Sequence, residues 1–195
     1  MARRVEFFFD FMSPYSYLAS TRVEAMVGGV GGEVVWRPCF LPGVLKATGN
    51  QGPGENAVKL PYVVKDVVAW AEHLGLPPLL IPDGFPFLAT QADRCALVAV
   101  DEGRGPAFCK AMFSAIWRDG RTPDEAAISD VLSAVGLDPA TVHALAATQP
   151  LKDRLRANTD EAARRGAFGV PAFFVGDELF MGNDRLDFVV RALQR

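Results

Sequence analysis

The apolar run near the start of the chain constrains the fold most. Residues 5–11 read Val-Glu-Phe-Phe-Phe-Asp-Phe, and this β-branched and aromatic stretch is typical of a strand buried on both faces. Asp10 inside the run is an anomaly that a structure has to explain. Ser13 and Pro14 follow at once. They predict a helix start, because Ser is a preferred N-cap and Pro is favoured at the first helical position.

The N-terminal segment is expected to be a β–α–β unit. A helix is predicted over Tyr15–Val27, and glycines after it end the helix. A second strand is predicted over Glu33–Leu41, where Pro38 indicates an edge strand or a bulge. The right-handed crossover rule makes the two strands parallel.

The C-terminal segment is expected to be a hairpin followed by a helix. An apolar strand is predicted over Gly169–Val175, and Gly176-Asp177 form a two-residue turn before the returning strand Glu178–Met181. A last helix is predicted over Arg185–Leu193. Strands at both ends of the chain therefore form one sheet.

The middle of the chain is expected to be helical after a long loop. Pro42–Pro61 is rich in Gly, Pro and Asn and predicts a loop. We predict an α/β protein with a thioredoxin-like fold and a large helical insertion. Residues 1–41 and 166–195 form the thioredoxin-like domain, and residues 42–165 form the helical insertion domain. The expected helices are Tyr62–Leu74, Thr90–Glu102, Pro106–Trp117, Pro123–Val135, Pro139–Ala147 and Leu151–Arg165.

Composition argues against several classes of partner. Twenty basic and 23 acidic residues give a net charge of −3 without a basic stripe, so we expect no nucleic-acid partner. No apolar run reaches the roughly 18–20 residues of a membrane span, and no signal peptide is evident. We expect a cytoplasmic protein. The three cysteines form no CxxC and the two histidines lie far apart, so we expect no metal site.

Ser13 is the first candidate functional residue. A helix start carries unpaired backbone N–H groups and a partial positive charge, which favour an anion. In thiol–disulfide oxidoreductases of this architecture a C-P-x-C motif occupies the place of the present Ser13-Pro14-Tyr15-Ser16, so dithiol chemistry is excluded here. A thiolate brought by a cofactor is the natural anion, because helix starts lower thiol pKa values. The alternative is that Ser13 is only an N-cap.

Two further segments carry candidate binding residues. Val170-Pro171 precedes the C-terminal hairpin; in thioredoxin-like proteins this X-Pro bond is cis and faces the first helix start. Gly182-Asn183-Asp184 begins the last helix. Its backbone N–H groups and the Asp184 carboxylate could hold the carboxylate and ammonium of a γ-glutamyl group. The alternative for Asp184 is a plain helix cap.

Four motifs together resemble the 2-hydroxychromene-2-carboxylate isomerase family and the related kappa-class glutathione transferases. The first two, Phe-Asp-Phe-x-Ser-Pro-Tyr-Ser-Tyr-Leu-Ala and Lys-Ala-Thr-Gly-Asn, occupy residues 9–19 and 46–50. The last two, Phe-Gly-Val-Pro-Ala-Phe-Phe-Val and Gly-Asn-Asp-Arg-Leu, occupy residues 168–175 and 182–186. The resemblance covers almost the whole chain, in the same order.

The resemblance implies a glutathione-dependent isomerase. It would interconvert 2-hydroxychromene-2-carboxylate and trans-o-hydroxybenzylidenepyruvate, or a close aromatic analogue, by reversible thiolate addition. It implies a homodimer and a role for Ser13 next to the glutathione sulfur. Met181 stands where some relatives carry Trp. The implied glutathione contacts are Ser13, Val170, Met181, Gly182, Asn183 and Asp184, and the implied substrate contacts are Leu45, Lys46, Asn56 and Phe85.

Two other functions remain open on the sequence alone. A kappa-like glutathione transferase would use the same Ser-Pro-Tyr-Ser motif to conjugate electrophiles instead of isomerising a substrate. A redox-inactive thioredoxin-like module would bind extended peptides along the strand after Val170-Pro171 without catalysis.

Overall fold

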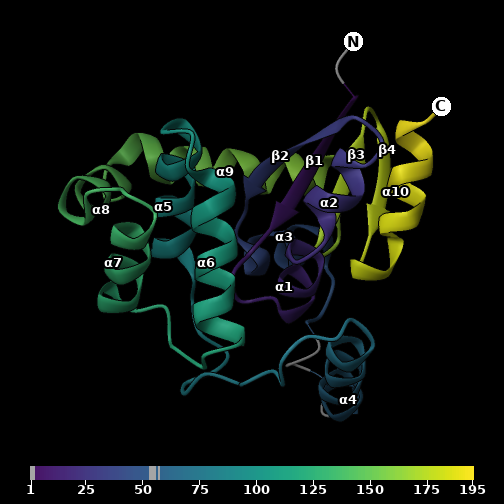
Figure 1. The fold of residues 1–195 in the computed structure, drawn as a ribbon, viewed down its shortest axis with the longest axis horizontal. Coiled ribbons are helices and arrows are strands. Elements are labelled where there is room, and N and C mark those ends of the chain that lie inside the picture. Colours follow the sequence, from purple (N-terminus) through teal and green to yellow (C-terminus); the bar gives the residue numbers. More distant parts are fainter. Residues whose placement is uncertain (1–2, 53–55, 57) are drawn as a thin grey trace.

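A four-stranded mixed sheet is the centre of the fold (Figure 1). The computed structural model describes residues 3–52, 56 and 58–195. The strand order is β2-β1-β3-β4, with β1 parallel to β2 and antiparallel to β3. The parallel pair, the C-terminal hairpin and the edge position of the strand with Pro38 confirm the predictions. The strands are β1 (Arg3–Phe9), β2 (Gly32–Pro38), β3 (Ala172–Val175) and β4 (Glu178–Met181).

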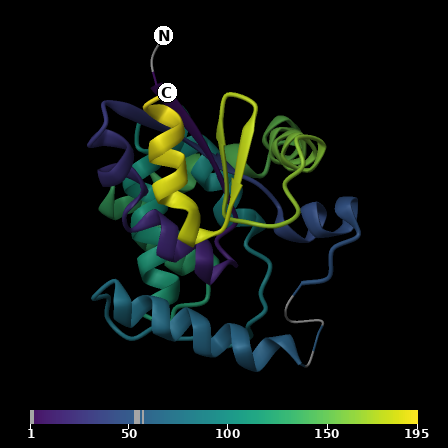
Figure 2. The same cartoon turned by 90° about the vertical axis from the view of Figure 1, so that its right-hand side faces the viewer.

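Helices cover both faces of the sheet. Side chains of α1 (Pro14–Ser20), α2 (Val23–Gly28) and α10 (Leu186–Leu193) share a buried cluster with one face. Side chains of α3 (Leu41–Thr48) and α9 (Gln149–Arg164) pack with the other. In Figure 2, α10 lies on one side of the β3–β4 hairpin, and α3 and α9 lie on the other. The sheet is thus the middle layer of three.

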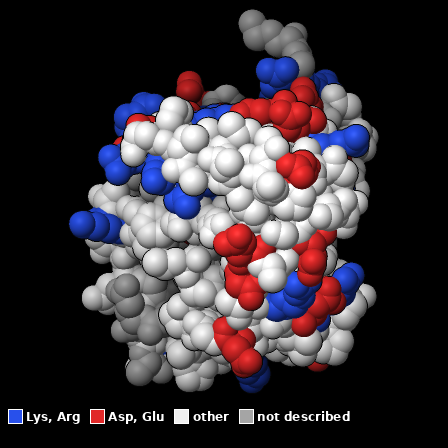
Figure 3. Space-filling view, turned by 90° about the vertical axis from the view of Figure 1, so that its left-hand side faces the viewer, with Lys and Arg blue, Asp and Glu red and all other residues white. Residues whose placement is uncertain are grey.

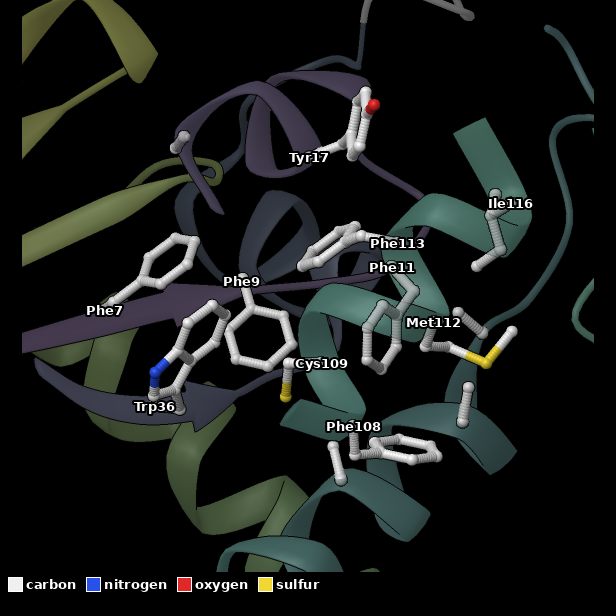
Figure 4. Close-up of a cluster of buried hydrophobic side chains, with 14 of the residues drawn as sticks. Phe7, Phe9, Phe11, Tyr17, Trp36, Phe108, Cys109, Met112, Phe113 and Ile116 are labelled. Atoms are coloured by element: carbon white, nitrogen blue, oxygen red, sulfur yellow. The ribbon is translucent and has the colours of Figure 1, made fainter. Parts of the chain in front are cut away.

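Aromatic side chains of β1 form the main core (Figure 4). Phe9 lies 5.5 Å from Trp36 of β2 and 5.5 Å from Phe113, between ring centroids. On the opposite face of the strand, Phe8 lies 5.5 Å from Phe174 of β3. All three β1 phenylalanines, residues 7–9, are fully buried. This confirms a strand buried on both faces.

The region between β2 and β3 is mostly helical, as expected. Phe113 of α6 packs on Phe9 of β1, so the same buried cluster joins the sheet and the helical region. The division into residues 1–41 with 166–195 and residues 42–165 stays a prediction. None of the described helices is both long and apolar enough to span a membrane. The helices of this region not yet named are α4 (Lys59–His73), α5 (Thr90–Asp101), α6 (Gly105–Trp117), α7 (Glu125–Ala134) and α8 (Pro139–Ala146).

Helix α3 lies where a loop was predicted. It begins at Leu41, the last residue of the predicted second strand, continues into the Gly- and Pro-rich stretch, and is capped by Gly49, whose φ is +67°. Two tertiary hydrogen bonds fix its start: the N–H of Phe40 donates to Oγ1 of Thr159 at 2.9 Å, and the N–H of Leu41 donates to Oδ2 of Asp10 at 2.7 Å. These partners are remote in sequence, so local composition could not reveal them.

The single helix predicted over Tyr15–Val27 is two helices, α1 and α2. At the break, Oγ of Ser20 donates to the carbonyl of Tyr17 at 2.7 Å, and Oγ1 of Thr21 donates to the carbonyl of Leu18 at 2.8 Å. Hydroxyls bonded in this way compete with the helical backbone pattern. The first helix is therefore shorter than expected.

Candidate active site

Ser13 is the N-cap of α1, as predicted. Its Oγ accepts a hydrogen bond from the backbone N–H of Ser16 at 3.2 Å, and Pro14 follows in the first turn. The side chain of Ser13 is only 4% exposed. Because α1 is short, its dipole is weaker than the sequence suggested.

The Ser13 hydroxyl faces the bend before β3. Its Oγ donates to the carbonyl oxygen of Val170 at 3.4 Å, and the Val170–Pro171 peptide bond is cis. A hydrogen bond of this length is weak. The hydroxyl proton can therefore turn to a stronger acceptor, such as a thiolate, without losing a strong bond.

The segment Gly182–Asp184 lies next to the Val170–Pro171 bend. The N–H of Gly182 donates to the carbonyl of Pro171 at 2.9 Å, and the guanidinium of Arg22 donates to the carbonyl of Asn183 at 2.5 Å. Gly182 has φ +99°, and a Cβ there would lie 2.6 Å from Oδ1 of Asp184. The positive φ and the close approach to Asp184 both favour glycine over any residue with a Cβ at position 182.

Two buried polar atoms near these segments have no partner among the described residues. They are Oγ of Ser16 and Nδ2 of Asn183. Buried polar groups are normally hydrogen-bonded, so such atoms are candidates for ligand contacts. Together with the backbone of Val170 and the exposed carboxylate of Asp184, they form a set of donors and acceptors suited to a tripeptide that carries a thiolate, carboxylates and an ammonium. These residues fit glutathione.

Met181, the remaining implied glutathione contact, lies in β4 opposite Ala172. It lines a shallow surface cleft of about 500 Å³ together with Phe168 and Phe188. Both phenylalanines are about half exposed. Met181 therefore adjoins the Gly182–Asp184 segment and borders an apolar surface.

The implied substrate contacts lie on different elements. Lys46 of α3 is exposed and lines a cleft between α3, α5 and α9, while Leu45 contacts the loop at Gly52. Oδ1 of Asn56 accepts hydrogen bonds from the N–H groups of Val58 and Lys59 at 3.0 and 3.2 Å. The Asn56 side chain thus satisfies backbone N–H groups at the start of α4.

Phe85 is the substrate candidate connected to the Ser13 loop. Its ring centroid lies 5.7 Å from that of Trp117, and Nε1 of Trp117 donates to the carbonyl of Phe11 at 3.0 Å. In the described part of the chain, no hydrogen bond or ring contact joins Phe85 to Lys46. The substrate roles of Leu45, Lys46, Asn56 and Phe85 stay predictions.

Known proteins resemble this chain over almost its full length. The sequence profile of the DSBA-like thioredoxin domain matches residues 4–194. A 2-hydroxychromene-2-carboxylate isomerase of Sphingobium xenophagum is 32% identical, covering 97% of both chains. A solved structure of 2-hydroxychromene-2-carboxylate isomerase aligns with a TM-score of 0.86 at 30% identity, covering 98% of this chain and 95% of that one.

The chain belongs to the 2-hydroxychromene-2-carboxylate isomerase family. This confirms the expected resemblance, the thioredoxin-like fold with its helical insert, and the isomerase class. Glutathione S-transferase kappa 1 of Homo sapiens is a more distant relative, 27% identical over 99% of this chain and 92% of its own length. The expected relation to the kappa class is therefore also confirmed.

In this isomerase-family chain, Asp10 holds the loop that carries Ser13. Its carboxylate accepts hydrogen bonds from the N–H of Met12 at 2.8 Å and from the N–H of Leu41 at 2.7 Å. Oδ1 of Asp93 accepts from the N–H of Phe11 at 3.4 Å. Both aspartates are buried, and burial raises the pKa of each, that of Asp10 to about 6. The anomaly noted in the sequence is a structural carboxylate.

Sequence reasoning missed several residues that support the site. The hydroxyl of Tyr15 donates to Asp66 of α4 at 2.7 Å, and burial and that carboxylate both raise the pKa of Tyr15. Arg22 lies over the ring of Trp70, 5.4 Å from its centroid. In the sequence, these residues appear only as polar or aromatic positions on predicted helices. Such a pattern does not reveal which residue of another helix each one contacts. These contacts hold α4 against the start of α1 and against the junction between α1 and α2.

Replacing Asp10 should change how stability depends on pH. Burial raises the pKa of Asp10 from 3.8 to about 6, so the folded protein binds this proton more tightly than the unfolded chain does. Its stabilising contribution is complete below pH 3.8 and is lost as pH rises to about 6, up to about 3 kcal/mol. In Asp10→Asn, the free energy of unfolding should fall less over this range. Urea unfolding at several pH values measures this, with exposed Glu33→Gln as control; equal slopes in all three proteins contradict the assignment.

Proposed function

We propose that this protein is a glutathione-dependent isomerase. It interconverts 2-hydroxychromene-2-carboxylate and trans-o-hydroxybenzylidenepyruvate, or a close aromatic analogue. The observation that supports this most is the Ser13 hydroxyl, which faces the carbonyl of Val170 at 3.4 Å in a chain of this isomerase family. Glutathione held there would supply a thiolate for reversible addition to the electron-poor alkene of the substrate. With the ring C–O bond cleaved and its oxygen protonated as a phenol, the former double bond could rotate, and loss of the same thiolate would restore the alkene.

The protein provides no reactive sulfur of its own. Cys39, Cys95 and Cys109 are all buried. Burial raises the pKa of each thiol, that of Cys95 to about 12, so they are protonated and inert at neutral pH. Ser13 and Ser16 cannot form a disulfide. A sulfur at this place therefore comes from a cofactor, and the three thiols accord with a cytoplasmic location.

Ser13 would stabilise the thiolate by donating a hydrogen bond. Its proton, which now points to the Val170 carbonyl, would turn to the sulfur, while Oγ would still accept from the N–H of Ser16. Val170 would pair with the peptide backbone of glutathione. The γ-glutamyl end would lie along Met181–Asp184, with Nδ2 of Asn183 donating to its carboxylate and Asp184 facing its ammonium. Ser13 thus acts electrostatically and forms no covalent bond.

The substrate would lie between Ser13 and the helical region. Phe85, next to Trp117, offers an aromatic wall, and Leu45, Lys46 and Asn56 remain proposed contacts. We also propose a homodimer. Helix α4 carries exposed apolar side chains, among them Tyr62 and Val64, which a second copy could cover.

Product analysis tests the proposed reaction. With 2-hydroxychromene-2-carboxylate and catalytic glutathione, we expect the benzylidenepyruvate isomer to form while the glutathione concentration stays constant. Omitting glutathione should abolish turnover. Net consumption of glutathione would indicate conjugation, as in a kappa-like transferase. No glutathione binding by calorimetry at millimolar ligand would favour the peptide-binding module.

Ser13→Ala should raise the pKa of bound glutathione and slow turnover. Loss of one hydrogen bond to a charged sulfur corresponds to about 1.5–3 kcal/mol, so kcat/KM at neutral pH should fall by about 10- to 100-fold. The pH–rate profile and the ultraviolet absorbance of the thiolate measure the two effects. Exposed Ser133→Ala in α7 is the matched control. An unaltered pH profile in Ser13→Ala would remove Ser13 from this role.

Asp184→Asn should weaken glutathione binding more than turnover. The carboxylate is exposed and already pairs with Arg185, so its contact with an ammonium contributes about 1 kcal/mol. We expect KM for glutathione to rise about fivefold and kcat at saturation to change little. Asp177→Asn, in the exposed hairpin turn, is the control. If KM for glutathione stays the same, Asp184 does not contact glutathione and only pairs with Arg185.

A further inference from the structure

A second cleft lies outside the Ser13 site. It has a volume of about 750 Å³ and opens between α3, α5 and α9. None of the residues that line it belongs to the segments 13–16, 168–171 or 181–184. Phe40 and Leu155 provide apolar walls, and the volume falls within the range of small-molecule sites.

The cleft is strongly basic although the chain is acidic overall. Lys46 of α3, Arg94 of α5, and Lys152 and Arg156 of α9 line it, against one acid, Asp160. None of the four cations lies within ion-pair distance of a carboxylate in the described parts of the chain. In Figure 3, basic side chains gather toward the left edge of this face, whereas its centre and right carry acidic side chains interspersed with basic ones. An excess of positive charge in a concave site favours an anionic ligand.

Arg94 is the most informative of these cations. Its Nε is buried and has no hydrogen-bond partner among the described residues. By contrast, Arg154, which lies on α9 with Lys152 and Arg156 but does not line the cleft, pairs with Asp101 at 2.5 Å. A buried guanidinium nitrogen without a partner is uncommon. Its planar fork matches a carboxylate, which would satisfy two of its donors.

The walls of the cleft are fixed to one another. The N–H of Phe40 donates to Oγ1 of Thr159 across the cleft's base at 2.9 Å. A Cβ at Gly43 would lie 2.8 Å from Cγ2 of Thr159, so α3 and α9 approach closely here because residue 43 is glycine. A preformed site loses less ordering entropy when a ligand binds.

We propose that this cleft binds a small organic dianion with an apolar ring, such as an aromatic dicarboxylate. One carboxylate pairs with the guanidinium of Arg94, and the second lies between Lys152 and Arg156. The ring packs on Phe40 and Leu155. Apart from Lys46, which is also a proposed substrate contact, the residues that line this cleft have no part in the proposed isomerase reaction.

Calorimetry with phthalate as the probe tests this site on the full chain. The natural protein should bind phthalate at millimolar concentration or below, more weakly as salt rises. Affinity should fall at least tenfold in Arg94→Gln and in the double variant Lys152→Gln with Arg156→Gln. Arg154→Gln, on the same helix, should bind like the natural protein. Glutathione affinity should be the same in all of them.

Four results would overturn the proposal. They are no phthalate binding at millimolar concentration, equal phthalate affinity in every variant, equal binding of the neutral ester dimethyl phthalate, and displacement of phthalate by glutathione. Arg94→Lys keeps the positive charge but not the planar guanidinium, and it controls for a folding defect caused by loss of that charge. It should bind phthalate more weakly than the natural protein and more tightly than Arg94→Gln. Phthalate binding in a protein that does not bind glutathione would support the cleft and refute the proposed isomerase reaction.

Discussion

The carboxylate of Asp10 is the constraint on which the site depends. It lies at the end of β1, fully buried, and accepts backbone hydrogen bonds from Met12 in the loop before Ser13 and from Leu41 at the start of α3. Without it, two partly buried N–H groups would lose their acceptor, which costs up to about 1–3 kcal/mol for each such group. One side chain therefore sets the path of the loop to Ser13 and the start of the helix on the other face of the sheet.

Much of the fold could be predicted because its signals are local. The aromatic run of β1, the Ser13-Pro14 helix start and the Gly176-Asp177 turn each specify their conformation through nearby residues. The meeting of Ser13 with Val170 was expected from the resemblance to thioredoxin-like proteins, in which the X-Pro bend faces the first helix start. The side-chain geometry then follows from β1 and β3 being neighbours.

The rest could not be predicted because its causes are remote in sequence. Helix α3 has no side-chain cap of its own; its start depends on Thr159 and Asp10, which lie far along the chain in either direction. The break between α1 and α2 comes from hydroxyl-to-carbonyl bonds that a hydrophobic period does not reveal. The partner of Arg22, the carbonyl of Asn183, likewise exists only after the hairpin has folded back.

A serine at position 13 changes the chemistry without changing the architecture. A thioredoxin-like site needs a donor group at a helix start opposite an X-Pro bend, and Ser13 and Val170 preserve that arrangement. A cysteine there would place the nucleophile on the protein, where it could also be oxidised. A hydroxyl does not ionise at neutral pH and cannot form a disulfide, so the site can stabilise a thiolate only when another molecule brings it. Under the proposed function, the buried Oγ of Ser16 and Nδ2 of Asn183, which have no partner among the described residues, would both bond to the molecule that brings the thiolate.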